Sequence, residues 1–437
     1  MNLHPNSIAI EGDDLSISYC ELMKWVYSYA NEISDKKISN SWIGIDLSLG
    51  WKAYPAILAC WVTGNGYLPI NFDFPKDRIL EIQNQVNWSL LINCATSFQK
   101  NSKVDIVNGE KAYLLFTSGT TGKPKGVPIN QNNLEAFVDH YLDHESIHFT
   151  SEDKFLQSYE LTFDVSVFCF LMPFLTGGTL VLPTHKKSKQ LGLFKAIEEY
   201  NVTVTSFVPS VIRLTIDFLP RIKFPYLRYS FFSGESLMGE WVKVWMESVP
   251  SAQVYNCYGP TETVIVCTEE LLNDLDDSYF ENSVPLPLGD KFKGIDFQIK
   301  EGEIVYTGKQ TFNGYLNQEP ITEYYSGDLA HIDENGKLIF DGRKDNQIQW
   351  NGYRIELEEI DRVLSQKIEG WVKTIFLKEL YKLVIFSNEA RPRIDVLLKG
   401  NFPDYYKPSS IIQLNELPLN LNGKIDVRKM IKIAKEE

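Results

Sequence analysis

Apolar residues at helical spacing mark the first element that the sequence predicts. Ser18 and Glu21 form a capping-box pair, in which two side chains satisfy free backbone groups at the start of a helix. The positions that follow place an apolar stripe on one helical face, made of Leu22, Val26, Tyr29 and Ile33. We therefore expect an amphipathic helix that packs on a core near the amino terminus.

Short β-rich runs then alternate with helical segments. The strand-like runs are YLLFT (113–117), TLVLP (179–183), VTVTSFV (202–208), LRYSFF (227–232) and AQVYN (252–256). Helices are expected near residues 190–200 and between the last two of these strands. This alternation is typical of βαβ units, and it predicts a largely parallel, buried sheet.

The character of the sequence changes after about residue 283. The turn sequences EGE (301–303) and ENG (334–336) separate alternating runs and predict antiparallel hairpins, which we expect to form a small β-rich subdomain. Nearer the carboxyl end, an amphipathic helix is expected from Arg354 to about Gln366, together with strands at WVKTIFL and YKLVIFS.

These patterns predict an α/β protein in two parts. A chain of 437 residues is long enough for about two or three domains. Residues 1–344 are expected to form a large N-terminal domain of βαβ sheets plus the small β-rich subdomain. Residues 345–437 are expected to form a small, mobile C-terminal α+β domain, joined through the sequence GRKD (342–345).

Composition and charge narrow the class of protein. The chain has 43 Lys and Arg against 57 Asp and Glu, and its net charge of -14 disfavours nucleic acid as the main partner. Its six cysteines show no close pairing, which indicates reduced thiols, and metal binding through cysteine or histidine is not expected. The amino terminus does not look like a signal peptide, and no apolar run approaches the roughly 20 residues of a membrane span. We expect a cytoplasmic protein with no membrane partner.

A stretch rich in glycine and hydroxyl groups follows the strand predicted at 113–117. The segment from Phe116 to Gly126 holds three glycines, three threonines, a serine and two lysines. Such a loop can direct backbone N–H groups and hydroxyls at a phosphate, although composition alone also allows a mobile surface loop. It is not a Walker loop, because Gly119 is followed too soon by Gly122 and Lys123, and then by a proline.

Six further motifs follow this loop in order along the chain. They are FDVS (163–166), NCYGPTET (256–263), GEIVYTGKQTFNGYL (302–316), YYSGDLA (324–330), GRKDNQIQWNGYRIELEEID (342–361) and NLNGKID (420–426). Together with TSGTTGKPKG (117–126), they resemble the adenylate-forming superfamily, and in particular the amino acid adenylation domains of nonribosomal peptide synthetases. The resemblance extends from about residue 8 to residue 430.

The resemblance implies a site for ATP and Mg²⁺. Glu262 is the implied Mg²⁺ ligand and Thr261 an implied phosphate contact, which suits a hard cation that keeps most of its waters. Lys424 is the implied catalytic lysine, whose charge would offset the charge that develops on the phosphate. The implied ATP-binding residues are Thr117, Ser118, Gly119, Thr120, Thr121, Gly122, Lys123, Lys125, Asn256, Tyr258, Asp328 and Arg343.

Several of these positions have an implied task. Tyr258 would pack on the adenine face and Asn256 would reach its polar edge, while Asp328 would accept hydrogen bonds from the ribose hydroxyls. Arg343 would contact ribose or phosphate, and Asp345 is the implied hinge of the C-terminal domain. Without the surrounding motifs, a tyrosine at such a position would indicate ordinary packing, an aspartate would indicate a turn cap, and a lysine would indicate a surface charge.

Asp164 in FDVS indicates the class of substrate. In amino acid-activating relatives, the aspartate of this motif pairs with the α-ammonium group of the substrate. Asp164 lies in an apolar stretch, where an unpaired carboxylate is costly, so either an internal partner or a cationic substrate group is required. The other implied pocket residues are uncharged and predict a small to medium, neutral amino acid; they are Val165, Phe168, Ser206, Phe231, Ser233, Gly234, Cys257, Ile265 and Val266.

The implied second half-reaction transfers the activated acyl group to a thiol. No carrier-protein motif stands beside these motifs, so the expected acceptor is the phosphopantetheine arm of a separate carrier protein. Two alternatives are kept. One is an acyl- or aryl-CoA ligase of the same superfamily, and the other is a nucleotide-binding scaffold that has lost catalysis.

Overall fold

The computed structural model describes residues 4–96, 104–117, 124–183, 189–281, 285–345, 347–419 and 425–436. Its contacts divide the chain into two compact units. The first unit comprises Met1–Asn71, Val86–Leu115 and Gly126–Lys344, and the second comprises Phe72–Gln85, Phe116–Lys125 and Asp345–Glu437.

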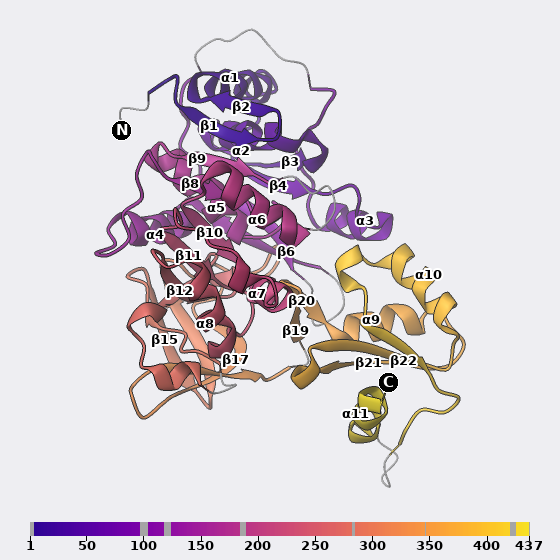
Figure 1. Ribbon diagram of the computed structural model, residues 1–437. Helices are drawn as coiled ribbons and strands as arrows, with labels where there is room; N and C mark the ends of the chain where they lie inside the picture. Colours follow the sequence, from indigo (N-terminus) through magenta and orange to yellow (C-terminus); the bar gives the residue numbers. More distant parts are fainter. Residues whose placement is uncertain are drawn as a thin grey trace. The chain divides into compact units, whose positions relative to one another are not determined.

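A mixed sheet dominates the first unit (Figure 1). Its strands lie in the order β14-β13-β12-β11-β10-β8-β9-β1-β2, and all pairs from β12 to β1 are parallel. The strands are β1 (Ile8–Gly12), β2 (Leu15–Ser18), β8 (Lys154–Leu156), β9 (Thr179–Leu182), β10 (Val204–Phe207), β11 (Tyr229–Phe232), β12 (Gln253–Tyr258), β13 (Thr268–Leu271) and β14 (Asp290–Lys291). The runs predicted at 179–183, 202–208, 227–232 and 252–256 are confirmed as strands of this sheet.

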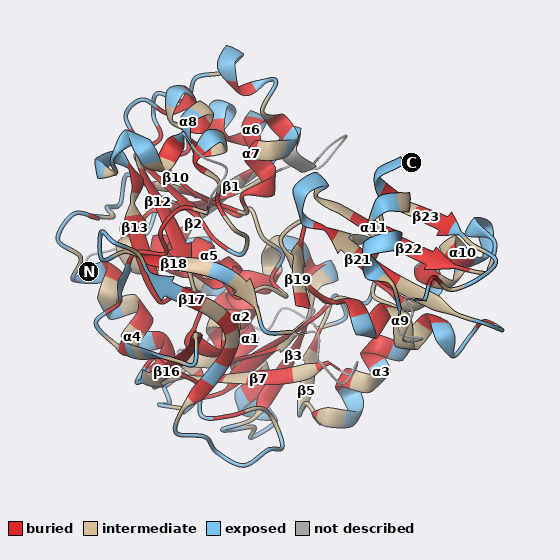
Figure 2. Cartoon of the chain, turned by 90° about the horizontal axis from the view of Figure 1, so that it is seen from below, coloured by how far each residue is buried: buried red, intermediate tan, exposed pale blue. Residues whose placement is uncertain are grey.

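Both faces of this sheet are covered. Alternate side chains of β11 enter two different cores, Phe231 on one face and Phe232 on the other. Strand β10 is buried along its whole length (Figure 2), and so is its neighbour β11. Both strands therefore carry apolar residues toward both faces of the sheet, together with the small buried residues Thr205, Ser206 and Ser230.

A second sheet runs β5-β3-β4-β6-β7, with parallel pairing of β3 to β4 and β5, and of β4 to β6. Its strands are β3 (Trp42–Asp46), β4 (Gly66–Ile70), β5 (Leu90–Ile92), β6 (Lys111–Thr117) and β7 (Lys125–Asn130). The run predicted at 113–117 lies in β6. The sequence patterns did not single out β3, β4 or β5, because apolar runs this short do not distinguish a strand from a buried helix.

The predicted β-rich subdomain is an antiparallel sheet in the order β15-β16-β17-β18. Its strands are β15 (Ile295–Lys300), β16 (Glu303–Gly308), β17 (Tyr324–Ile332) and β18 (Leu338–Arg343). The turns predicted at 301–303 and 334–336 join these strands. Glu301 and Gly302 both have positive φ, at 52° and 83°, which a two-residue hairpin turn requires.

The helices of the first unit cover these sheets. They are α1 (Tyr19–Asp35), α2 (Ala53–Val62), α4 (Gln131–Leu142), α5 (Val165–Thr176), α6 (Lys189–Tyr200), α7 (Ser210–Thr215) and α8 (Gly239–Ser248). The capping box of α1 is confirmed, and its predicted apolar stripe is buried. Within the described part of the chain, no helix is both long enough and apolar enough to cross a membrane.

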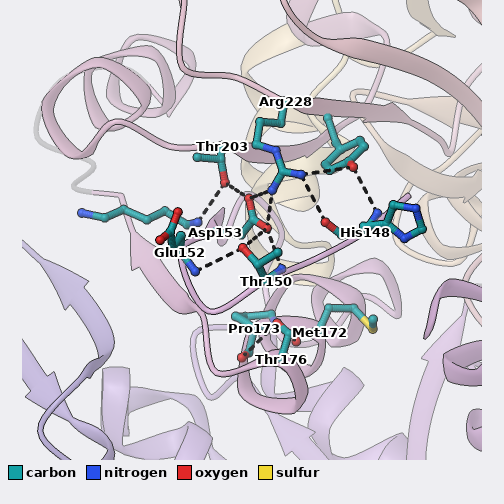
Figure 3. Close-up of polar contacts among 11 residues, drawn as sticks. His148, Thr150, Glu152, Asp153, Met172, Pro173, Thr176, Thr203 and Arg228 are labelled. Carbon is teal, nitrogen blue, oxygen red and sulfur yellow. Dashed lines mark hydrogen bonds and ion pairs between the residues drawn. The ribbon is translucent and has the colours of Figure 1, made fainter. Parts of the chain in front are cut away.

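A buried carboxylate ties together the amino ends of three parallel strands (Figure 3). Asp153, only 1% exposed, precedes β8 and accepts hydrogen bonds from Thr203 Oγ1 and Arg228 NH1, each at 2.7 Å. Thr203 precedes β10 and Arg228 precedes β11. Arg228 also donates to the carbonyl of His148 at 3.2 Å, so one network fixes the loop that enters the sheet.

The second unit has an α+β architecture. It contains α3 (Lys76–Gln85), β19 (Gln347–Trp350), β20 (Tyr353–Glu356), α9 (Leu357–Ser365), β21 (Val372–Leu377), β22 (Lys382–Ser387), α10 (Arg391–Asn401), β23 (Ser410–Gln413) and α11 (Val427–Glu436). The expected helix start at Arg354 is wrong, because residues 353–356 form β20. The two-residue turn Asn351-Gly352, with φ of 52° and 82°, pairs β20 with β19 and delays the helix to Leu357.

Residues 72–85 reach the core of the second unit from a distant part of the sequence. Arg78, 9% exposed, places NH1 3.8 Å from Glu359 Oε1 on α9. Tyr406 donates to the other oxygen of Glu359 at 2.7 Å. The ring of Phe74 meets Tyr405 edge-on at 6.3 Å. Helix α3 is thus held in the second unit by a buried ion pair and aromatic packing.

Candidate active site

The glycine-rich loop lies between two strands. Thr117 is the last residue of β6 and Lys125 is the first residue of β7. The six predicted phosphate-loop residues between them, Ser118 to Lys123, lie outside the described residues. A loop that leaves the end of a buried strand is the expected setting for phosphate binding.

Three of the predicted nucleotide-binding residues meet at one point of the first unit. Asp328 on β17 is 6% exposed, and its Oδ2 accepts a hydrogen bond from the Tyr258 hydroxyl at 2.5 Å. Its Oδ1 accepts from Arg343 NH1 on β18 at 2.6 Å. Burial, and then the Asp328 charge, raise the pKa of Tyr258 well above its ordinary value, so this hydroxyl keeps its proton and donates. A carboxylate oxygen has two lone pairs, so Asp328 retains capacity to accept further hydrogen bonds.

Asn256 is two residues before Tyr258 in the sequence, and it is buried. Its side-chain amide bonds to backbone carbonyl groups. Its side-chain nitrogen donates to the carbonyl oxygens of Pro287 at 2.7 Å and Leu286 at 3.4 Å. These bonds fix the chain segment that precedes β14. The contact predicted between Asn256 and adenine stays a prediction.

Glu262 lies in the short 3₁₀ helix Thr261–Thr263, directly after the Gly259-Pro260 turn. It is fully buried, and its Oε1 accepts a hydrogen bond from the Tyr315 hydroxyl at 2.7 Å. Its backbone carbonyl accepts from Phe312 N at 2.8 Å. An oriented, buried carboxylate is a fitting donor for a hard cation such as Mg²⁺.

The two residues that follow this turn have an uncommon backbone conformation. Val264 and Ile265 have φ of 60° and 69°, a region that β-branched residues rarely adopt. Such strain persists only where neighbouring contacts impose it, and it concentrates at functional sites. Ile265 is one of the predicted substrate-pocket residues.

Gln310, which sequence reasoning did not single out, holds this strained segment. Its side chain is fully buried, and Nε2 donates to the carbonyls of Thr263 at 2.8 Å, Val264 at 3.3 Å and Val266 at 2.6 Å. Gln310 lies inside the motif 302–316, and its place in that motif was the available signal.

Asp164 is the N-cap of helix α5. It is 8% exposed, and its Oδ1 accepts a hydrogen bond from Val165 N at 2.8 Å. A negative charge at a helix amino terminus is favoured by the helix dipole. Burial, together with the Asp164 charge, raises the pKa of Tyr67 and Tyr113 well above the usual range. In the described structure, neither tyrosine hydroxyl has a hydrogen-bond partner.

The predicted pocket residues come from α5, from the strands β10, β11 and β12, and from the segments that follow β11 and the 3₁₀ helix Thr261–Thr263. Phe168 and Phe231 meet edge to face at 5.3 Å, and Ser206 is the register partner of Phe231. Gly234 is exposed with φ of 87°. The remaining members are buried and uncharged: Val165, Phe168, Ser206, Phe231, Ser233, Cys257, Ile265 and Val266.

Tyr141 on α4 extends this wall and was missed by sequence reasoning. Its ring lies 5.2 Å from Phe168 and 5.9 Å from Phe231, so Tyr141 packs on the same aromatic wall. Burial, with the nearby Glu269 charge, raises the pKa of Cys257 well above its usual value, so the thiol stays protonated. Cys257 therefore acts as a neutral wall residue.

Besides the loop segment Phe116–Lys125, two further predicted residues belong to the second unit. Asp345 is its first residue after the long first-unit segment, and it accepts a hydrogen bond from Gln347 N at 3.3 Å. Lys424 lies outside the described residues. The parts assigned to both residues stay predictions.

Comparison with known proteins agrees with these motifs. Residues 96–316 match the family described as AMP-binding enzyme. A D-alanine–D-alanyl carrier protein ligase of Bacillus licheniformis is 30% identical over 490 residues, covering 98% of this chain and 96% of the relative. A ligase of the same name from Staphylococcus epidermidis is 32% identical over 430 residues, covering 85% of each protein.

Solved structures share the fold. The chain matches holo-PA1221, an NRPS protein containing adenylation and PCP domains, with a TM-score of 0.85 and 22% identity, over 99% of this chain and 82% of that one. It matches the Vibrio cholerae adenylation domain AlmE, solved with glycyl-adenosine-5'-phosphate, with a TM-score of 0.81 and 21% identity, over 99% and 95% of the two chains. The predicted α/β fold with its β-rich subdomain is thereby confirmed.

Proposed function

The chain belongs to the family of AMP-binding enzymes, and from this membership we propose that it is an AMP-forming ligase of an amino acid and a carrier protein. It would use ATP to convert the amino acid to an aminoacyl adenylate, releasing pyrophosphate. It would then transfer the aminoacyl group to the phosphopantetheine thiol of the carrier protein.

One observation carries this proposal. The similarity to D-alanine–D-alanyl carrier protein ligases runs along nearly the whole length of both chains, so it spans every motif at which the two half-reactions would occur. Asp164 supplies the feature that separates amino acid activation from fatty or aryl acid activation. It is a buried carboxylate at the start of α5 that can accept an α-ammonium group.

The first half-reaction needs charge stabilisation and alignment. A carboxylate oxygen of the amino acid attacks the α-phosphorus as the bond to pyrophosphate breaks, so attacker and leaving group must be held in line. We assign the loop from Thr117 to Lys125 to the β- and γ-phosphates, and Asp328 with Arg343 to the ribose side. Lys424 would offset the charge that grows on the phosphate oxygens.

Glu262 is the residue that would hold Mg²⁺. Its hydrogen bond from Tyr315 fixes one carboxylate oxygen in place, and Mg²⁺ commonly takes one or two protein carboxylates while keeping its waters and substrate phosphates. A bound Mg²⁺ would neutralise phosphate charge.

We infer D-alanine as the first substrate to test. The relatives reported above are D-alanine–D-alanyl carrier protein ligases, and, apart from Asp164 and the exposed Gly234, the pocket residues described here are buried and uncharged. An anionic side chain would enter this wall without a partner, so acidic amino acids should be rejected. The six cysteines are free, which is consistent with the cytoplasm that we propose as the site of reaction.

The decisive experiment is ATP–pyrophosphate exchange with a panel of acids. The panel holds D-alanine, L-alanine, glycine, D-serine, D-glutamate, a fatty acid and an aryl acid. We expect exchange with small neutral amino acids, fastest with D-alanine, and then radiolabel transfer to a phosphopantetheinylated carrier protein. Exchange confined to the fatty or aryl acid, with transfer to coenzyme A, would instead identify an acyl- or aryl-CoA ligase.

Lys424→Ala tests whether the chain is a catalyst or a lapsed scaffold. Loss of a transition-state donor should lower the exchange rate at least about a hundredfold. Nucleotide binding, measured by calorimetry, should change far less. Equal exchange by the variant and the parent would remove Lys424 from the mechanism, and no exchange by the parent with any acid would favour the scaffold.

A further inference from the structure

His140, His144 and Glu269 form a cluster that the proposed reaction does not use. His140 lies in the last turn of α4, His144 follows the end of that helix, and Glu269 lies on β13. One nitrogen or oxygen atom from each residue lies within 4.8 Å of the others. Sequence spacing did not indicate this group, because Glu269 is 129 positions from His140.

Both histidines contact the same oxygen of Glu269. The distance to Oε1 is 2.9 Å from His140 Nε2 and 2.8 Å from His144 Nε2. Burial disfavours the charged form of Glu269, but the hydrogen bonds from the two histidines outweigh burial and lower its pKa. Both histidines thus lie against one oxygen of the carboxylate.

The second oxygen of Glu269 is not explained by these bonds. Glu269 is 9% exposed, and across the ranges that the structure describes its Oε2 is buried without a hydrogen-bond partner. Leaving a buried, charged acceptor unsatisfied is costly. A purely structural role explains the hydrogen bonds of Oε1, but it gives no reason for burying Oε2 without a partner.

The surroundings add negative charge. Asp290 on β14 is the register partner of Glu269, so both carboxylates leave the same face of the sheet, with Cβ atoms about 5 Å apart. Both line a cleft of about 870 Å³, together with the two histidines. Lys337 and Lys291 also line the cleft, but they pair with Glu270 and Asp296. A cation from solvent would relieve the repulsion between these facing carboxylates.

Hydrogen bonding separates the tasks of the two histidines. Ser146 N and Ile147 N both donate to His144 Nδ1, each at 3.0 Å, so Nδ1 carries the lone pair and Nε2 carries the proton. A histidine that binds a metal usually donates through its other ring nitrogen, which His144 cannot do here. His144 instead suits the task of holding Oε1 through Nε2–H. His140 Nε2 also lies 2.9 Å from Oε1, so a metal ion bound at this nitrogen would replace the proton of that hydrogen bond.

We propose that this cleft binds a divalent transition metal ion through His140 Nε2 and Glu269 Oε2, with Asp290 as a further carboxylate and His144 orienting Glu269. Imidazole together with carboxylate is a donor set suited to Zn²⁺ and related ions rather than to Mg²⁺. The site goes beyond the proposed ligase reaction. It is also distinct from the Mg²⁺ position proposed at Glu262, which does not line this cleft.

Cobalt spectroscopy on the full chain tests this proposal without relying on activity. The protein is first freed of metal with a chelator and then titrated with Co²⁺, whose visible absorption reports nitrogen and oxygen ligands directly. We expect saturable absorption at one equivalent, displaced by Zn²⁺ and unaffected by excess Mg²⁺. Glu269→Gln and His140→Ala should each weaken Co²⁺ binding at least about tenfold.

Matched variants separate ligands from bystanders. His144→Ala should weaken binding about tenfold to a hundredfold but keep the shape of the spectrum, as expected for a residue that orients a ligand. His331→Ala should change nothing, because His331 is an exposed histidine paired with Asp341 on the β-rich subdomain. Should Glu269→Gln fail to fold, the exposed Asp290→Asn provides the carboxylate test. A parent protein without a saturable Co²⁺ spectrum, or unchanged affinity in His140→Ala, would overturn the proposal and leave a hydrogen-bonded structural cluster.

Discussion

At the scale of single residues, Asp164 combines two tasks that substitution can separate. As N-cap it accepts from Val165 N, and as a buried anion it is the proposed partner of the substrate ammonium. Asparagine also caps helices well but carries no charge. Replacing Asp164 by asparagine therefore keeps the first task and removes the second.

We predict that Asp164→Asn raises the KM for the amino acid at least about tenfold, since a charge-assisted hydrogen bond contributes roughly 1.5–3 kcal/mol. The KM for ATP and the thermal midpoint should stay close to those of the parent. Pyrophosphate exchange at varied amino acid and varied ATP provides both constants. Equal losses in the two KM values would instead indicate that Asp164 supports the fold of the site as a whole.

Gln310 allows a second test at the same scale. Its amide nitrogen serves three carbonyls of the segment that contains Val264 and Ile265, both at positive φ. Gln310→Ala removes that donor, and the strained backbone can then relax away from the substrate pocket. We predict a loss of about tenfold in kcat/KM for the amino acid, with Gln318→Ala, an exposed glutamine nearby in sequence, as the unaffected control. Unchanged kinetics in Gln310→Ala would show that the loop keeps its shape without this side chain.

Sequence predicts some residues of the site better than others, for a physical reason. Glu262 and Asp328 belong to motifs in which identity and spacing are both diagnostic. Gln310 and Tyr141 contribute through contacts with distant segments: Gln310 reaches a loop 44 to 47 positions away. The motif 302–316 contains Gln310, but nothing in the local sequence of either residue shows which distant segment its side chain contacts.

At the scale of elements, the difference between local sequence pattern and tertiary contacts also explains which strands were predicted. The runs that became β9 to β12 are rich in apolar, aromatic and β-branched residues and alternate with helical segments, so their type was evident. The strand β20 was read as part of a helix because the apolar periodicity of α9 extends back into it. The Asn351-Gly352 turn, whose positive φ values favour a hairpin, overrode that periodicity.

The Asp153 network yields a prediction about these elements. Asp153→Ala leaves Thr203 and Arg228 without their acceptor at the amino ends of β10 and β11. Arg228 is 41% exposed in its side chain and can regain water, which limits the loss. We predict a decrease of about 2–3 kcal/mol in the free energy of unfolding, measured by urea denaturation.

The control is Glu152→Ala, at the exposed neighbouring position, whose free energy of unfolding should lie within about 0.5 kcal/mol of that of the parent. A similar value for Asp153→Ala would mean that the strand ends are fixed by packing alone.

At the scale of the whole molecule, residues 72–85 place a constraint on the proposed two-step mechanism. They belong by contact to the second unit, but the chain joins them at both ends to the first, through β4 and β5. If the second unit turns about Asp345 between half-reactions, these residues cannot simply follow it. The Arg78–Glu359 ion pair and the Phe74–Tyr405 contact would then belong to one stage of the cycle.

Weakening that ion pair should therefore change the two half-reactions unequally. Arg78→Ala removes a buried charge partner, and a difference of about 1 kcal/mol between two states is roughly a fivefold change in their ratio. We predict that the ratio of the pyrophosphate exchange rate to the carrier-loading rate changes at least about threefold in Arg78→Ala. It should not change in Asp77→Asn, at the exposed neighbouring position of the same helix.

The double variant Arg78→Ala with Glu359→Gln removes both charges, so a restored ratio would trace the effect to the uncompensated carboxylate rather than to the lost contact. If both rates fall by one common factor, the ion pair stabilises the second unit without selecting a stage of the cycle.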